Sequence, residues 1–350
     1  MVPKTRRVVT RDGAGRIAVV EGPIPDLKPG SVLVEVRSCL ISPGTELGGI
    51  LAQRANPDPA RPARPFGYGN AGVVLGVGEG CEAAFEPGMR VACMGGGYAL
   101  HASHAVVPRN LTVPIPEGLS FDEAAFAHLA ATALWAVRRA RIEFAQNVAV
   151  FGLGLVGQIA AQIARCSGAH VMAVDTAPFR LEIASTCGTD LAFNLAEGHV
   201  EAAAAAFTRG HGIDAVIIAF GGEATAAIKA ACAMMKTALD GHQYGAIVIV
   251  GGARFEGQFP TPFGNIDVRA SSRPGPGYHD EAWEFGRDYP PALVQWHTRR
   301  NLEACLLFAA RGRLNYEALI THRLPLEQAP EGCEELIHHP DRALGVILNP

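Results

Sequence analysis

The sequence predicts an α/β protein with two domains, a doubly wound parallel sheet and a second domain rich in β-strands. Short apolar segments alternate with helical segments from about residue 147 to residue 268, a pattern typical of a parallel sheet covered on both faces. A Gly-x-Gly-x-x-Gly loop at 152–157 directly follows the first apolar segment. The first 120 residues carry short β-branched segments separated by Gly and Pro, as in an antiparallel barrel-like domain.

The elements of the β-rich part come first along the chain. We expect strands at 32–36, 71–77 and 105–107. Ser120, with acidic residues in the turn that follows it, indicates a helix start, and a long alanine-rich helix is expected over 124–139.

The parallel sheet and the C-terminal part follow. We expect buried strands at 148–151, 171–174, 215–219 and 246–250, with helices at 158–166 and 180–187. Beyond residue 268 we expect a long loop at 273–289, a helix at 301–310 and a strand at 343–348 that rejoins the N-terminal domain. Residues 1–129 and 270–350 are therefore assigned to the β-rich domain and residues 130–269 to the sheet domain.

Composition excludes several classes of partner. A formal net charge of −4 and a pI near 6.3 give no reason to expect nucleic acid or a membrane surface as a partner. No apolar run approaches the ~20 residues that span a bilayer, and the basic start is not followed by a secretory signal. The eight cysteines form no Cys-x-x-Cys pair, so free thiols and a cytoplasmic location are expected.

The glycine loop predicts a dinucleotide site. Gly152 permits a tight turn, Gly154 lets the backbone approach a pyrophosphate, and Gly157 lets the helix pack close to the strand. Leu155 and Val156 belong to the same loop, and the helix that leaves it has free N–H groups that favour phosphates. The competing interpretation is a plain glycine turn beside a surface acid.

Asp175 decides the expected cofactor. It ends the next strand, eighteen residues after Gly157, where a carboxylate accepts hydrogen bonds from the ribose hydroxyls of NAD and repels the 2′-phosphate of NADP. Arg180 lies close by and could contact the adenine or weaken this preference. The sequence therefore predicts NAD.

With these motifs in place, the chain resembles the medium-chain dehydrogenase/reductase, or alcohol dehydrogenase-like, superfamily over nearly its whole length. Beyond the glycine loop and Asp175, the resemblance is carried by the segments 29–34, 111–118, 131–133, 251–252 and 320–326. It implies a Rossmann domain that includes Gly251 in the cofactor site, a GroES-like catalytic domain, and a homodimer formed through the edge of the cofactor sheet.

The departures from the zinc-containing members concern the metal. Where those members have Cys-Gly-Thr-Asp, the segment 41–46 reads Ile-Ser-Pro-Gly-Thr-Glu, and where they have Gly-His-Glu, residues 67–69 read Gly-Tyr-Gly. His128 falls at the third ligand position, and Cys93 alone stands in the region of the four-cysteine lobe. A catalytic zinc needs about three protein ligands, so we expect no metal. The chain is similar to a branch that includes bacteriochlorophyllide hydroxyethyl dehydrogenases and putative dehydrogenases found near sugar-modifying enzymes.

Without zinc, a side chain must handle the alcohol proton. His128 is the first candidate for the base and Tyr68 the second, although each could equally be a satisfied core residue. Thr45 matches the hydroxyl that relays protons in the zinc enzymes. Glu46 could orient Thr45 or His128, or could form a structural ion pair.

Two further histidines are candidates for substrate contacts. His101 and His104 stand three apart on an extended segment and point to opposite faces, which argues against a shared metal and leaves His101 as the candidate. His279 lies in the polar loop 271–280, which could cover a polyhydroxylated or acidic substrate or form a subunit contact.

The sequence as a whole predicts a zinc-independent, NAD-dependent oxidoreductase that interconverts a secondary alcohol, such as a polyol or sugar-like compound, and a ketone. An NADPH-dependent enone or quinone reductase and a non-catalytic NAD(H)-binding protein remain open as alternatives. The expected partners are a small-molecule substrate and a second copy of the chain.

Overall fold

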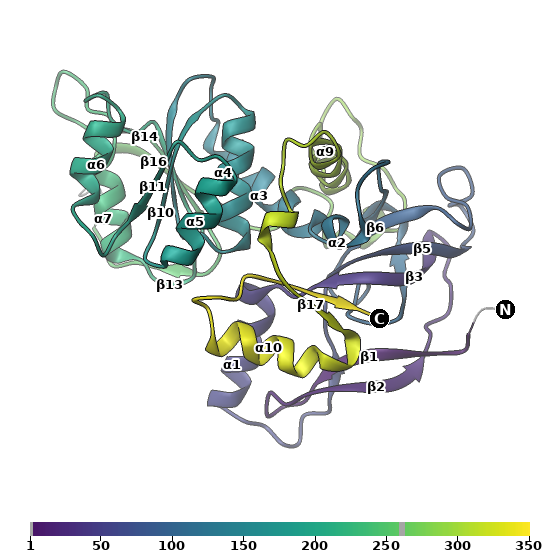
Figure 1. Cartoon of the computed structure of the whole chain (residues 1–350). Helices are drawn as coiled ribbons and strands as arrows, with labels where there is room; N and C mark the ends of the chain where they lie inside the picture. The colour runs from purple at the N-terminus through teal and green to yellow at the C-terminus, as the bar shows by residue number, and fades with distance from the viewer. Residues whose placement is uncertain (1–2, 259–262) are drawn as a thin grey trace. The chain divides into compact units, whose positions relative to one another are not determined.

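The computed structural model describes residues 3–258 and 263–350 (Figure 1). The chain divides into two compact units. The first unit comprises Met1–Ala131, Pro274–Gly312 and Ile320–Pro350, and the second comprises Thr132–Arg273 and Arg313–Leu319.

The second unit is built on a six-stranded sheet in which all neighbours are parallel. Its strands are β9 (Asn147–Phe151), β10 (His170–Asp175), β11 (Leu191–Asn194), β12 (Ala215–Ile218), β14 (Tyr244–Val250) and β16 (Asn265–Ser271). Their order, β11-β10-β9-β12-β14-β16, is the 3-2-1-4-5-6 order of a Rossmann fold counted from β9. The predicted fold class of this part is confirmed.

Helices cover both faces of this sheet. Figure 1 shows α4 and α5 on one face and α6 and α7 on the other. The helices are α4 (Leu155–Cys166), α5 (Pro178–Thr186), α6 (Val200–Phe207) and α7 (Thr225–Met234), with a short turn η3 (Glu317–Leu319) and a two-stranded pair β13 (Gly222–Glu223) and β15 (Ala253–Arg254). The strand β9 is buried from Val148 to Phe151 because both of its faces meet helices, which explains its unbroken apolar sequence.

The first unit contains two sheets. The larger has the order β17-β18-β3-β5-β6-β8, with β7 also paired to β3, and the smaller has the order β2-β1-β4. The strands are β1 (Thr5–Arg11), β2 (Ile17–Pro23), β3 (Ser31–Leu40), β4 (Arg64–Pro65), β5 (Gly69–Val77), β6 (Arg90–Met94), β7 (His104–Pro108), β8 (Thr112–Pro114), β17 (Ile320–Pro325) and β18 (Gly345–Asn349). As expected, the C-terminal strand β18 rejoins the N-terminal part, since it pairs antiparallel with β3.

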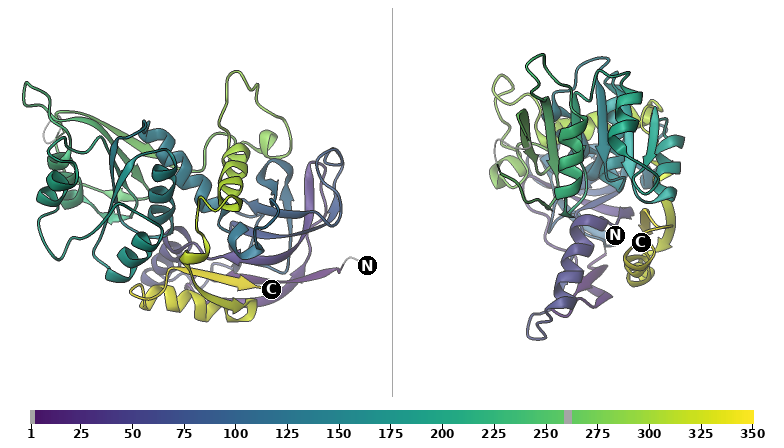
Figure 2. Two further views of the ribbon diagram at one scale, coloured as in Figure 1. Left: turned by 45° about the horizontal axis from the view of Figure 1, so that its top comes forward. Right: turned by 90° about the vertical axis from the view of Figure 1, so that its left-hand side faces the viewer.

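Short helices surround these sheets. Figures 1 and 2 show α10 beside the C-terminal strands β17 and β18. The helical segments are η1 (Pro43–Leu47), α1 (Gly48–Ala55), η2 (Arg109–Leu111), α2 (Phe121–Ala124), α8 (Glu281–Glu284), α9 (Thr298–Ala310), η4 (Leu326–Gln328) and α10 (Ala329–His338). The helix α3 (Ala127–Ala140) begins in the first unit and ends in the second.

Two expectations about helices need correction. The helix expected over 124–139 is split: Ser120 and Glu123 form a capping box that starts the single turn α2, this turn ends at Ala124, and α3 begins at Ala127. The loop expected at 273–289 contains α8, whose N-cap Asp280 accepts the Trp283 N–H. Among the described residues, no helix is long and apolar enough to cross a membrane.

Candidate active site

The glycine loop of the second unit is shaped by one left-handed backbone angle and one close approach. Gly152 has φ +87°, and a Cβ on Gly157 would lie 1.8 Å from the Gly152 carbonyl oxygen. Gly154 is different, because a Cβ there would meet nothing within 4 Å. The helix α4 begins at Leu155 with Gly154 as its N-cap, so its first N–H groups face the open side of the loop. Gly152 and Gly157 therefore serve the backbone turn, whereas Gly154 leaves space beside it.

Asp175 ends β10 next to this loop. Its Oδ2 accepts the Leu153 N–H at 2.6 Å, and its Oδ1 accepts the N–H groups of Thr176 and Ala177 at 2.7 and 2.9 Å. The carboxylate is buried and uses three of its roughly four acceptor positions on the backbone. It therefore anchors the glycine loop and keeps about one position for a ribose hydroxyl.

The remaining predicted cofactor residues lie at the same edge of the sheet or near it. Gly251 directly follows β14 and has φ +97°. Arg180 lies in α5, and its carbonyl accepts a hydrogen bond from Gln158 Nε2 of α4 at 2.7 Å. Because the strands are parallel, the carboxyl ends of β9, β10 and β14 meet at one edge.

In the first unit, Glu46 and His101 form a buried ion pair. Glu46 lies in η1, directly after β3, and His101 lies in the bend before β7. His101 Nε2 is 3.1 Å from Glu46 Oε2, and both side chains are buried. Burial alone would lower the pKa of His101, but the Glu46 carboxylate and the contact with Cys39 outweigh it and raise the pKa to about 10. His101 is therefore positively charged at neutral pH.

Two further contacts fix this pair. Glu46 Oε2 also accepts the Ser42 N–H at 2.8 Å, which closes the turn after β3. Asn70 in β5 donates from Nδ2 to the Leu100 carbonyl at 2.9 Å, next to His101. The ion-pair alternative for Glu46 is thus the arrangement that the structure has.

Tyr68 lies immediately before β5, and its hydroxyl donates to Ser42 Oγ at 2.5 Å. Burial, the largest effect, and the Glu46 charge raise the pKa of Tyr68 to about 12, although the hydroxyls of Ser42 and Thr45 act in the opposite direction. Tyr68 therefore keeps its proton at neutral pH. Thr45, on the same turn as Glu46, is exposed.

His128 stands in the first turn of α3 with its ring edge-on to that of Tyr68, at a centroid distance of 4.7 Å. Its Nδ1 is 3.0 Å from the Ala125 carbonyl, which can only accept, so Nδ1 carries the proton. Burial, which outweighs the attraction of Glu46, lowers the pKa of His128 to about 4. His128 is therefore neutral and a weaker base than an ordinary histidine.

The His128 ring occupies the space beside Gly69. A Cβ on Gly69 would lie 2.1 Å from His128 Nδ1. This is the position at which the zinc-containing members carry an acid, so no side chain fits there while His128 keeps its place.

The loop that carries His279 is tied to the same unit. The Tyr278 hydroxyl accepts the Gly96 N–H at 2.9 Å, and the rings of Tyr278 and His279 stack at 3.9 Å. His279 is exposed and has φ +73°, and its N–H is accepted by Glu284 Oε1 at 2.8 Å. His279 thus lies on the surface of an anchored loop.

The structure brings Glu46, Tyr68, His101 and His128 into one cluster and places His279 on the separate loop. Sequence reasoning missed Ser42, which links Tyr68 to the Glu46 turn. Ser42 stands in the motif 41–46, but only the folded turn reveals its two contacts. Asn70 gave no signal in the sequence.

The donor set does not suit a zinc ion. Within residues 3–258 and 263–350, no group of three His, Cys, Asp or Glu side chains is arranged to hold a metal. The three former ligand positions are Pro43, which has no donor atom, the protonated Tyr68, and His128, so a single imidazole remains where a catalytic zinc needs about three protein ligands.

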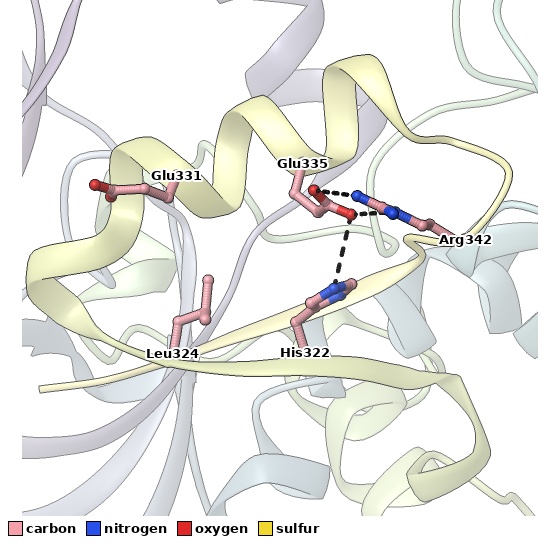
Figure 3. A pocket seen from close by; sticks show the side chains of 5 residues that line it. All are labelled: His322, Leu324, Glu331, Glu335 and Arg342. Atoms are coloured by element: carbon pink, nitrogen blue, oxygen red, sulfur yellow. Dashed lines mark hydrogen bonds and ion pairs between the residues drawn. The ribbon is translucent and has the colours of Figure 1, made fainter.

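A separate groove of about 390 Å³ lies between α10 and β17 (Figure 3). Three of its polar groups pair with one another, since Glu335 is 2.7 Å from Arg342 and 3.8 Å from His322. None of the predicted site residues lines it.

Comparisons with known proteins agree with the fold. The family model described as zinc-binding dehydrogenase matches residues 156–286. A sorbitol dehydrogenase of Bacillus subtilis (strain 168) is 23% identical over 381 aligned positions, which cover 100% of this chain and 98% of the relative. A D-guloside 3-dehydrogenase of Escherichia coli (strain K12) is 30% identical over 241 positions, which cover 66% of this chain and 62% of the relative. The solved structure of alcohol dehydrogenase TADH from Thermus sp. ATN1 superimposes with a TM-score of 0.77 at 25% identity and covers 98% of this chain and 99% of its own.

Proposed function

Because this chain belongs to the medium-chain dehydrogenase/reductase superfamily and is an alcohol dehydrogenase-like oxidoreductase, we propose that it interconverts a secondary alcohol and a ketone with NAD and without zinc. The observation that carries the proposal is the packing of His128 against Gly69, which fills the place of an acidic residue and sets a protonated Tyr68 beside a neutral imidazole. The substrate class we propose is a polyol or sugar-like compound, as the names of the sorbitol and guloside dehydrogenases suggest.

The cofactor, when bound, supplies hydride exchange with the carbon that bears the substrate oxygen. In the direction of reduction, the Tyr68 hydroxyl gives its proton to the substrate oxygen, and Thr45 passes a proton from water to Tyr68. The His128 Nε2 bears the lone pair, because Nδ1 holds the proton, and it accepts a hydrogen bond from the product hydroxyl. Oxidation runs these transfers in reverse.

Asp175 supports NAD over NADP. A buried carboxylate beside the loop favours a ribose hydroxyl and repels a 2′-phosphate. Titration with NADH and NADPH, followed by nucleotide fluorescence, should give tighter binding of NADH. Tighter binding of NADPH would instead favour an enone or quinone reductase.

Zinc independence is tested by metal analysis together with activity. We expect NADH formation with at least one polyol or glycoside from a screen that includes sorbitol, at a rate that a chelator leaves unchanged and in protein with less than about one zinc per ten chains. Activity that a chelator abolishes and zinc restores would refute the metal-free proposal. Tight NADH binding without turnover of any compound would favour a non-catalytic protein.

Quaternary structure and location complete the proposal. We propose a cytoplasmic homodimer formed through β16, the strand at one edge of the parallel sheet. Light scattering on the eluted protein should give twice the chain mass of 36.8 kDa.

A further inference from the structure

The turn after β3 is held by the negative charge of Glu46, although the stability of the turn does not require a charged side chain. Glu46 Oε2 takes both the Ser42 N–H and His101, whereas Glu46 Oε1 is buried and has no hydrogen-bond partner among the described residues. An unsatisfied buried polar atom is destabilising, and a buried ion pair is weak evidence for stability. An apolar side chain would therefore close this turn at lower cost.

The same turn carries Ser42, whose hydroxyl forms a hydrogen bond with the Tyr68 hydroxyl. Ser42 is itself buried, so its Oγ offers Tyr68 an acceptor that water does not easily replace. The Ser42 N–H and Oγ belong to one residue, so a contact that fixes the backbone of Ser42 also fixes the position of the Tyr68 hydroxyl oxygen.

We propose that the Glu46–His101 pair positions Ser42 against Tyr68, and that Ser42 holds the Tyr68 hydroxyl oxygen in place; with substrate bound, the Ser42 hydroxyl turns to donate to that oxygen, which leaves the Tyr68 proton for the substrate. Ser42, Glu46 and His101 are positioning residues in this arrangement, and Tyr68 touches the substrate oxygen. The inference rests on the proposed function of Tyr68, but the placement of its hydroxyl can be measured without turnover.

His101 is needed because, among the residues that the structure describes, no other cationic side chain forms a salt bridge with the buried Glu46 carboxylate. Burying such a charge alone is strongly unfavourable, and the backbone N–H of Ser42 offsets only part of it. Loss of His101 should therefore let the turn move and release Ser42, even though His101 does not touch Tyr68.

The first measurement is spectroscopic. The chain has six tyrosines, and labelling them with ¹³C at Cζ gives resonances among which Y68F identifies that of Tyr68. We expect S42A and H101Q each to shift the Tyr68 resonance. The matched control is S31A, which removes a buried serine hydroxyl that donates to the Lys28 carbonyl at 2.6 Å, and it should leave the resonance in place.

The second measurement is kinetic. Loss of one hydrogen bond of about 1 kcal/mol predicts a fall in kcat of about fivefold in S42A, with KM within twofold of the wild type. S42T, which restores a hydroxyl, should recover part of kcat. In the Y68F background S42A should have no further effect, because both changes act on one group.

Three results would overturn the proposal. One is an unchanged Tyr68 resonance in S42A, and another is an unchanged resonance in folded H101Q. The third is a fall in kcat on S42A that is equally large in the wild-type and Y68F backgrounds. If H101Q does not fold, the double variant E46Q/H101Q replaces it in the experiment, because it exchanges the ion pair for a hydrogen bond between two neutral side chains. A Y68F variant with wild-type kcat would remove the proposed catalytic role of Tyr68, while the resonance shifts would still report the positioning.

Discussion

Replacement of Gly69 by alanine tests the packing on which the proposed metal-free mechanism depends. In the structure a Cβ at this position would lie 2.1 Å from His128 Nδ1, 2.3 Å from Cε1 and 2.6 Å from Cγ. Ordinary contacts begin near 3.5 Å, so the ring would have to withdraw by about 1.4 Å (3.5 − 2.1). G69A therefore cannot be accommodated without displacing His128.

The energetic cost has two parts. Overpacking in a filled interior costs about 1–3 kcal/mol. Withdrawal of the ring also stretches the 3.0 Å bond from His128 Nδ1 to the Ala125 carbonyl, and loss of that bond costs about 0.5–1.5 kcal/mol. We expect G69A to lower the free energy of unfolding by about 2–4 kcal/mol.

Urea unfolding of four proteins measures this effect: wild type, G69A, H128A and G69A/H128A. Because H128A removes the ring, the Gly69 substitution should cost almost nothing in that background, and the cycle should give a coupling energy of about 2–3 kcal/mol. The control is G48A, since Gly48 is helical and a Cβ there meets nothing within 4 Å, so its stability should rise or stay level. Equal stability of G69A and the wild type would refute the packing argument.

Three other predictions concern pH and the cofactor site. The pKa of His101 is raised to about 10, so its contribution to stability should be complete below pH 6.5 and lost as pH rises towards 10. The pKa of His128 is lowered to about 4, so its contribution to stability should be complete above pH 6.5 and lost as pH falls towards 4. Urea titrations across this range should show a flatter alkaline limb in H101Q and a flatter acid limb in H128N, and unchanged limbs would contradict the assignment. G157A should weaken NADH binding at least about tenfold and also lower stability, because its Cβ would meet the Gly152 carbonyl at 1.8 Å, whereas G154A should weaken NADH binding at normal stability. D175A should lower the melting temperature even without cofactor, since three backbone N–H groups lose their acceptor; an unchanged melting temperature would mean that Asp175 does not anchor the loop.

The cofactor half was readable from the sequence because its signals are local. A strand, three glycines and a helix start are contiguous at 147–166, and Asp175 follows at a fixed spacing. Burial on both faces makes the strands apolar throughout, so the composition of these segments indicates the parallel sheet. The three backbone bonds to Asp175 were not readable, since they depend on how the loop folds back over β10.

In the first unit, the sequence predicted the residue types of the candidate catalytic cluster but not the contacts between them. Glu46 and His101 are 55 positions apart and meet only because β3, β5 and the bend before β7 fold together. The sequence left three possible roles for Glu46, and periodicity cannot choose among them. Likewise, the helix expected over 124–139 breaks near Ala125, and that break supplies the carbonyl that fixes the tautomer of His128.

The opposite charge states of the two histidines near Glu46 follow from which one touches it. His101 reaches the carboxylate oxygen directly and is charged, whereas the Nδ1 of His128 is used on the Ala125 carbonyl, and its pKa is lowered further by the charge on His101. One carboxylate thus balances one imidazolium, and a second proton on His128 would place two buried cations beside a single anion. The proposed mechanism consequently assigns proton donation to Tyr68, a neutral group that gives its proton only as the substrate oxygen gains charge. In the proposed metal-free mechanism a positioned hydroxyl takes the place of Lewis-acid polarisation, so the position of the Tyr68 oxygen matters more there than the strength of any base.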